Sequence, residues 1–396
     1  MKNILLISEL YPLPSKENKS TSVCHYFTRE WVKDGHRVVV FHFQPVHLLL
    51  WHLGVKFFGR WLENRLGGIY YSRRIRRVEH YEMEGVSVYR IPVFIPIPHG
   101  RFSRRSVEKF VDLARKALES ESFVPDIITG HMLPLEIIPE LNKHFGAKTC
   151  MVSHGVSLKE KTRYPDADAL VASYDIWGFR ARPIMEKFEE LYGRPRKSFM
   201  CFSGIPESTL CKANVHSFEG KLHSFLYVGD LISRKYPEIL LHAIPAVSNE
   251  YSIVYVGSGE LYPVLVKKIS ELQIGDKVSF TGQIDRNAIL SRYDEADCMI
   301  MVSENEAFGL VHLEAMARGC LAIASRGEGM DGIIVDGKNG FLCKAGDSEE
   351  LAATIRRINA LSPAERMSVS EDAVKTASAM TDRKMAEEYL NVLINL

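Results

Sequence analysis

Apolar and polar positions along the chain alternate in a strand–helix order that recurs twice. In the amino-terminal half, the apolar run Asn3–Ser8 predicts a strand, residues 23–34 have helical spacing, and residues 37–43 are β-branched and aromatic. Strands separated by helices indicate a parallel sheet with right-handed crossovers. Further strands of this half are expected at residues 86–91, 127–129, 149–152 and 169–172.

The same order starts again after a polar, weakly patterned stretch. Strands are expected at Ser224–Val228 and Ser252–Val256, with a helix at residues 238–247 between them. The later elements are strands at residues 278–281, 298–302 and 321–324 and an amphipathic helix at residues 373–393. The predicted fold class is therefore α/β, with two consecutive Rossmann-like units.

These patterns predict two domains and a terminal helix. We expect the first domain to span residues 1–203 and the second residues 204–375, with a hinge near residues 203–221. Residues 376–396 are expected to form a helix that packs back towards the first domain. Because ligands of open α/β sheets bind beyond the carboxyl ends of the strands, two facing sheets would form one interdomain cleft.

Composition narrows the class of protein. The formal net charge of the 396 residues is +1, so no bulk electrostatic field attracts nucleic acid. The seven cysteines show no CxxC spacing, which leaves a zinc or redox motif without support and fits a reducing compartment. The first apolar run is too short for a signal peptide, and no stretch reaches the roughly 18 apolar residues of a membrane span. We therefore expect a cytoplasmic protein.

Residues 47–77 interrupt the strand–helix order with aromatic, aliphatic and basic side chains. Trp51, Phe57 and Phe58 stand among lysines and arginines, and a second basic cluster lies within residues 101–109. Such a composition is typical of a segment at the surface of an anionic membrane, here the inner face of the cell membrane. An ordinary helix pair with a solvated basic face has the same composition, and both interpretations remain open.

The densest group of candidate site residues is the segment SENEAFGLVHLEAMARG, residues 303–319. It begins as a polar loop after a predicted strand and is expected to become helical from about Phe308. Backbone amides at a helix N-terminus favour anions such as a diphosphate, and Gly309 lets a ligand approach the backbone. Glu306 could reach ligand hydroxyls, and Glu314 could accept two hydroxyls of a ribose. Alternatively, Glu306 caps the helix and Glu314 is a surface residue.

This segment resembles the Glu-x7-Glu signature of glycosyltransferase family 4, in which EGFGLxxxE is followed by an EAMAxG helix. The two glutamates of the signature are Glu306 and Glu314 here. The resemblance continues through CLAIAS (320–325) and DGKNGFL (336–342), and YVGDLISRK (227–235) is similar to the family's VGRLxxxKG strand-turn. It covers essentially all of the carboxyl-terminal half and is looser before it.

The resemblance implies a retaining, nucleotide-sugar-dependent hexosyltransferase with the GT-B fold, in which an acceptor domain precedes a nucleotide-sugar domain. Glu306 would lie by the donor sugar, Glu314 would bind the ribose, and Lys235 would neutralise the leaving diphosphate. The other donor-binding residues that it implies are Arg234, Gly282, Gln283, Ile284, Phe308, Gly309 and Leu310.

Two segments of the carboxyl-terminal half depart from the family pattern. The family's phosphate-binding arginine, five residues before the lysine, is Asp230 here, so that Arg234 would compensate or Asp230 would turn away. The family's GGxxE segment reads GEGMDG at residues 327–332.

In the amino-terminal half, three short segments resemble the family. DIITGH (126–131) resembles a strand that ends in a histidine by the donor sugar, which makes His131 a catalytic candidate. SHG (153–155) resembles the next strand end and makes His154 a candidate cleft residue. DADALVA (166–172) resembles the family's DADALVxxS strand. A structural role is the alternative for each histidine.

The expected chemistry is transfer of a sugar from a UDP-sugar, or a GDP-sugar, to a glycan or a polyprenyl-diphosphate-linked acceptor in capsule or exopolysaccharide biosynthesis. Amides and cations would stabilise the leaving diphosphate, and with no metal motif evident we expect neither a cofactor nor a metal. A sugar-nucleotide epimerase, a storage-glucan synthase and a catalytically silent GT-B assembly partner remain alternatives. A dehydrogenase is disfavoured because no GxGxxG follows the first strand.

Overall fold

The computed structural model describes residues 1–14, 22–66, 74–96, 102–156, 158–164, 166–211 and 216–396. It divides into two compact units. The first unit comprises Met1–Arg180, Ile184–Cys201 and Arg383–Leu396, and the second comprises Ala181–Pro183 and Phe202–Asp382. We predicted domain boundaries at residues 203 and 375, and the units change at 201 and 382. Among the described residues, no helix is both long and apolar enough to cross a membrane.

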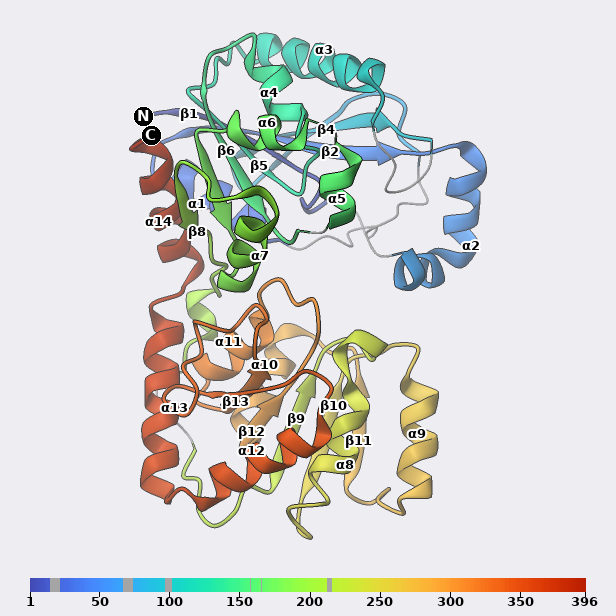
Figure 1. Ribbon diagram of the computed structural model, residues 1–396, viewed down its shortest axis with the longest axis vertical. Helices are drawn as coiled ribbons and strands as arrows, with labels where there is room; N and C mark the ends of the chain where they lie inside the picture. Colours follow the sequence, from blue (N-terminus) through green and yellow to red (C-terminus); the bar gives the residue numbers. More distant parts are fainter. Residues whose placement is uncertain (15–21, 67–73, 97–101, 157, 165, 212–215) are drawn as a thin grey trace. The chain divides into compact units, whose positions relative to one another are not determined.

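The first unit is built on an eight-stranded sheet in the order β3-β4-β2-β1-β5-β6-β7-β8, parallel except for the β3–β4 hairpin. Figure 1 shows α3 and α4 on one side of this sheet and α1 on the other. Ile4, Leu5, Leu6 and Ile7 of β1 are fully buried, as expected for a central parallel strand covered on both faces. Its strands are β1 (Asn3–Ser8), β2 (Arg37–Val46), β3 (Glu79–Met83), β4 (Val86–Phe94), β5 (Ile127–His131), β6 (Lys148–Ser153), β7 (Ile176–Phe179) and β8 (Ser198–Met200).

Among the described residues, helices connect these strands. They are α1 (Val23–Lys33), α2 (Leu49–Leu66), α3 (Arg104–Ser120), α4 (Ile137–Asn142), α5 (Leu158–Arg163), α6 (Ala167–Ala172) and α7 (Arg182–Tyr192), the first residues of which lie in the second unit.

The second unit contains a six-stranded parallel sheet in the order β11-β10-β9-β12-β13-β14. Numbered within the unit, this is the order 3-2-1-4-5-6 of dinucleotide-binding Rossmann folds. Its strands are β9 (Ser224–Val228), β10 (Ser252–Val256), β11 (Val278–Gly282), β12 (Cys298–Ile300), β13 (Leu321–Ser325) and β14 (Phe341–Cys343). The direction of strand succession reverses between β9 and β12, which pair with each other.

Helices and 3₁₀ turns complete the second unit. They are η1 (Glu207–Thr209), η2 (Ser233–Lys235), η3 (Pro237–Ile239), α8 (Leu240–Ala243), α9 (Tyr262–Glu271), α10 (Arg286–Glu295), α11 (Leu310–Ala317), α12 (Ser348–Ala360) and α13 (Pro363–Ser378). The last helix, α14 (Asp382–Ile394), lies almost entirely in the first unit.

Three predicted elements were wrong. Residues 169–172, and the DADALVxxS likeness, are not a strand but part of α6, because Ala167 and Val171 face the core at helical spacing. The helix at 238–247 is reduced to η3 and α8. The single helix at 373–393 is two helices, broken where Ile205 pairs with Thr381: the Ile205 amide donates to the Met380 carbonyl, and the Asp382 amide to the Ile205 carbonyl.

Candidate active site

Lys235 and Glu306 flank the point of the second sheet where the strand succession reverses. Lys235 lies in the turn after β9, and Glu306 lies in the loop after β12. The Lys235 ammonium is 3.9 Å from Oε2 of Glu306, and an Nη1 of Arg234 is 3.6 Å from the same oxygen. Ligands of open α/β sheets bind in the crevice at this reversal. The two cations and the carboxylate thus stand at the expected ligand position of this fold.

Two hydrogen bonds, one between backbone groups and one from a side chain, hold the two loops together. The Glu304 amide donates to the Arg234 carbonyl at 2.8 Å, and the Arg234 guanidinium donates to the Glu304 carbonyl at 3.3 Å. The side chains of Lys235 and Glu306 are only 13% and 20% exposed, whereas that of Arg234 is 42% exposed. Arg234 is therefore the more adaptable of the two cations.

The loop at residues 327–332 holds the backbone of Glu306 through two hydrogen bonds. The Glu306 amide donates to Oε2 of Glu328 at 2.8 Å, and the Gly329 amide donates to the Glu306 carbonyl at 3.0 Å. A Cβ at Gly329 would stand 2.5 Å from backbone atoms of Phe308, so only glycine allows this approach. The sequence comparison with GGxxE pointed to this segment, but it did not reveal the Glu328 contact.

Gly309 begins α11 in a left-handed conformation, with φ at 94°. Amides at a helix N-terminus lack a helical carbonyl partner and suit oxygen ligands, and in this turn the His312 amide already donates to the Gly309 carbonyl at 3.0 Å. The His312 ring is buried next to this turn. Its Nε2 lies 2.9 Å from the Met301 carbonyl oxygen, and its Nδ1 lies 3.2 Å from the Gly309 carbonyl oxygen. Phe308 is buried and packs against Phe202. His312 thus ties the start of α11 to the end of β12.

Glu314 is held by two residues of α10 that the sequence did not point to. An Nη2 of Arg286 is 2.7 Å from Oε1 of Glu314, and the Tyr293 hydroxyl donates to Oε2 at 3.4 Å. Burial raises the pKa of Glu314, and the Arg286 charge opposes that rise. Gln283 and Ile284 form the turn that leads from β11 into α10 and so lie in the chain next to Arg286.

Asp230, the departure from the family pattern, has an exposed side chain at the end of β9. Its carbonyl accepts hydrogen bonds from the Tyr227 hydroxyl at 2.9 Å and from the Ile232 amide at 3.0 Å. The backbone at Asp230 therefore shapes the turn that carries Arg234 and Lys235.

In the first unit, His131 ends β5 and is completely buried. Its Nδ1 lies 3.0 Å from Nε2 of the half-buried His154, and its Nε2 lies 3.2 Å from the hydroxyl of Tyr389 in α14. Burial, with the nearby Arg180 charge, lowers the pKa of His131 to about 3 and also lowers that of His154. Both rings are therefore neutral near pH 7. The structure brings the two predicted histidines together but leaves His154 as the one with solvent access.

The family profile described as "Glycosyl transferases group 1" matches residues 212–376, which include the loops around Lys235, Glu306 and Glu314. The match covers less than half of the 396 residues. The group 1 segment lies within the second unit.

Curated relatives align with parts of the chain. N-acetyl-alpha-D-glucosaminyl L-malate synthase of Bacillus anthracis is 38% identical over 100 residues, which are 25% of this chain and 26% of that protein. D-inositol 3-phosphate glycosyltransferase of Streptosporangium roseum is 28% identical over 190 residues, 44% of this chain and 43% of that protein. The alignments thus span less than half of the length of either relative.

Solved structures match over the whole chain and confirm the GT-B fold class. Sucrose-phosphate synthase from Thermosynechococcus elongatus has a TM-score of 0.71 at 17% identity, covering 100% of this chain and 99% of that one. Anabaena Alr3699/HepE, solved in complex with UDP and glucose, has a TM-score of 0.68 at 16% identity and covers 100% of both chains. At identities of 16–17%, the similarity shows a shared fold and nothing further.

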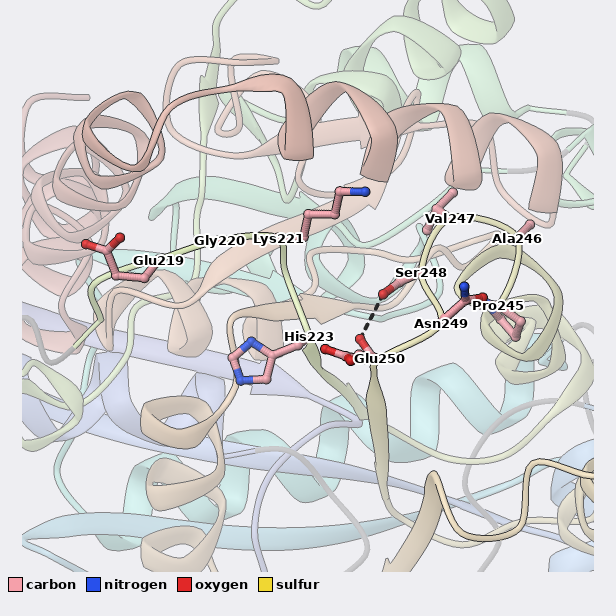
Figure 2. A pocket seen from close by; sticks show the side chains of 10 residues that line it. All are labelled: Glu219, Gly220, Lys221, His223, Pro245, Ala246, Val247, Ser248, Asn249 and Glu250. Atoms are coloured by element: carbon pink, nitrogen blue, oxygen red, sulfur yellow. Dashed lines mark hydrogen bonds between the residues drawn. The ribbon is translucent and has the colours of Figure 1, made fainter.

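A surface hollow of about 780 Å³ lies at the other edge of the group 1 sheet. Figure 2 shows its lining side chains, among them Lys221, His223 and Glu250. His223 lies directly before β9 and Glu250 lies two residues before β10, so this hollow is at the amino ends of the strands, away from the Lys235–Glu306 loops. Within the described residues, no group of three or more histidine, cysteine or acidic side chains is placed to bind a metal ion.

Proposed function

We propose that the protein is a glycosyltransferase that moves a hexosyl group from a nucleotide-sugar donor to a glycan or lipid-linked acceptor. The observation that carries the proposal is the cluster of Arg234, Lys235 and Glu306 at the strand reversal of a group 1 domain. Cleavage of the anomeric bond leaves negative charge on the diphosphate, and fixed cations beside amides stabilise such charge.

Each member of the cluster has a distinct proposed role. Lys235, largely buried and held near Gly229 and Glu306, neutralises the leaving diphosphate. Arg234, more exposed, supplies a second positive charge in place of the family arginine that Asp230 replaces. The Glu306 carboxylate orients hydroxyls of the transferred sugar, and the amides of Phe308, Gly309 and Leu310 bind its oxygens or the phosphate.

Glu314 is proposed to bind the ribose. Its oxygens are bonded to Arg286 and Tyr293, so the ribose hydroxyls would share the carboxylate with the guanidinium. Gly282, Gln283 and Ile284 border the base. A UDP-sugar is the preferred donor, with a GDP-sugar as the alternative; the solved relative in complex with UDP supports the choice.

Retention of the anomeric configuration and independence from a metal complete the proposal. Positive charge from Arg234 and Lys235 would serve the leaving group in the way that a divalent cation does in other transferases. His131 and His154, neutral near pH 7, can each donate one hydrogen bond and accept one, and they are proposed to act in the acceptor unit.

The test is release of nucleoside diphosphate from a panel of UDP- and GDP-sugars, with and without EDTA, with a polyprenyl-diphosphate-linked sugar as acceptor. We expect release from at least one donor, unaffected by EDTA, and a product with the anomeric configuration of the donor by NMR. No release from any donor would contradict the proposal and favour a catalytically silent assembly partner. A free-sugar product would favour an epimerase.

A further inference from the structure

The outward face of α2 is apolar. Leu49, Leu50, Leu53 and Phe57 are exposed by 54%, 80%, 47% and 73%. Leu50, Leu53 and Phe57 follow one another at helical spacing and so form one stripe. Helices on the surface of a globular protein normally turn charged and polar residues outward. The polarity of α2 is therefore the reverse of that expected for a helix in contact with water.

The inner face of α2 shows that the helix is docked in this orientation by specific contacts. His52 and Val55 are 4% and 5% exposed. Nε2 of His52 accepts a hydrogen bond from the His47 amide at 3.2 Å, and Nδ1 of His47 lies 3.0 Å from the Ile95 carbonyl. The buried side thus contains a polar histidine, while leucine and phenylalanine side chains face outward.

Exposed positive charge surrounds the beginning of this helix. Lys56 on α2 is exposed, and so are Arg105 and Lys109 on α3. Arg104 is exposed as well, but its Nε is 2.9 Å from Oε1 of Glu108. The two helices start at adjacent points of the sheet, because the Ile95 amide donates to the Val46 carbonyl and the Ser106 hydroxyl donates to the Phe94 carbonyl. The side chain of Phe94 is itself 42% exposed.

We propose that α2 lies in the surface of an anionic membrane, with Leu50, Leu53 and Phe57 among the acyl chains and the basic side chains at the lipid headgroups. An interfacial helix needs an apolar stripe and flanking positive charge, and α2 with the start of α3 supplies both. A second copy of this chain would cover the leucines equally well, but it would bring the same positive charges together. The charge therefore favours lipid, and the inference is independent of the donor chemistry.

The test is co-sedimentation of the full chain with phosphatidylglycerol-containing vesicles and with pure phosphatidylcholine vesicles. The altered protein carries Leu50→Ser, Leu53→Ser and Phe57→Ser. A matched control carries Tyr262→Ser, Val264→Ser and Val266→Ser, which remove exposed apolar side chains from α9. We expect the parent and the control to bind the anionic vesicles and the α2 variant to bind about tenfold more weakly or not at all.

Two further measurements keep the result interpretable. Binding by the parent should weaken as salt is raised, because the headgroup attraction is screened. The α2 variant should melt cooperatively near the temperature of the parent, since the replaced side chains are exposed. Equal binding of parent and α2 variant, equal binding to both vesicle types, or dimerisation of the parent that the α2 variant loses would each overturn the proposal.

Discussion

The Tyr389 hydroxyl lies 3.2 Å from Nε2 of His131, although 258 residues separate them in the chain. The same hydroxyl is hydrogen-bonded to Thr129, and the Tyr389 ring packs edge-on against Trp31. Trp31 in turn donates to the Ala386 carbonyl at 2.9 Å. The last helix is therefore part of the polar core of the first unit, at the strand that carries the histidine.

Tyr389→Phe should destabilise the first unit by about 1–3 kcal/mol, because buried polar groups of Thr129 and His131 lose a partner. Urea unfolding followed by tryptophan fluorescence measures this unit, since all four tryptophans lie in it. Tyr26→Phe, which alters a hydroxyl outside this network, is the control. Equal midpoints for Tyr389→Phe and the parent would show that the hydroxyl contributes nothing.

The stability of the first unit should depend on His131 in mild acid. Burial lowers the pKa of His131 to about 3 in the folded chain, against 6.5 for a free histidine. Between those values the unfolded chain binds the proton and the folded chain does not, so stability falls as the pH drops below about 6.5. From pH 7.5 to pH 5 the cost should be about 1–2 kcal/mol.

A comparison with His131→Gln isolates this effect, since other groups titrate as well. Burial raises the pKa of Glu9 to about 8, which acts in the opposite direction: the folded chain keeps that proton and gains stability as the pH falls. The parent should lose about 1–2 kcal/mol more than His131→Gln over the same pH range. An identical pH dependence of the two proteins would mean that His131 is protonated in the folded state.

Gly329→Ala should disrupt the loop at residues 327–332, which holds the backbone of Glu306. Its Cβ would stand 2.5 Å from the Phe308 backbone, so the loop has to move and its hydrogen bond to the Glu306 carbonyl is strained. We expect a loss of about 1–3 kcal/mol in the second unit, measured by circular dichroism on heating. Gly275→Ala is the matched control, because a Cβ there meets no atom within 4 Å. If both variants melt alike, the close packing at Gly329 is not rigid.

Lys235→Ala should lower kcat about 100-fold for the donor that the parent uses, with a small change in KM, because the cation acts on charge that develops as the bond breaks. Steady-state release of nucleoside diphosphate measures both constants. Lys267→Ala removes a lysine whose side chain is 79% exposed on α9 and should leave both unchanged. A Lys235→Ala variant with the parent's kcat would exclude this lysine from leaving-group stabilisation.

Much of the fold follows from local pattern. The strands β1, β9 and β10 have the predicted bounds, because short apolar runs between glycine or polar residues leave little freedom. The prediction of a strand at residues 169–172 was wrong because aspartate and alanine alternate at strand period in this segment. In the structure, the burial of Ala167 and Val171 follows the helical period. The break between α13 and α14 depends on pairing with Ile205, a contact far away in sequence.

The candidate site, too, could be predicted only as far as its residues belong to local motifs. Lys235 and Glu306 were predicted from motifs and lie 3.9 Å apart. Arg286 as the partner of Glu314 had no signal, since it lies in another helix and belongs to none of the motifs. Side-chain partners from distant elements are fixed by tertiary packing, which a single sequence does not specify.

A nucleotide-sugar site at the strand reversal of the second unit has to bind a nucleotide, and calorimetric titration of UDP and GDP into the parent, Glu314→Ala and Glu295→Ala measures that binding. Glu295 is an exposed acid at the end of α10, so its variant is the control. We predict that the parent and Glu295→Ala bind one of the two nucleotides with equal affinity and that Glu314→Ala binds it about tenfold or more weakly, through loss of charged hydrogen bonds. Equal affinity of Glu314→Ala and the parent would exclude Glu314 from the nucleotide site, and no binding of either nucleotide would exclude the site itself.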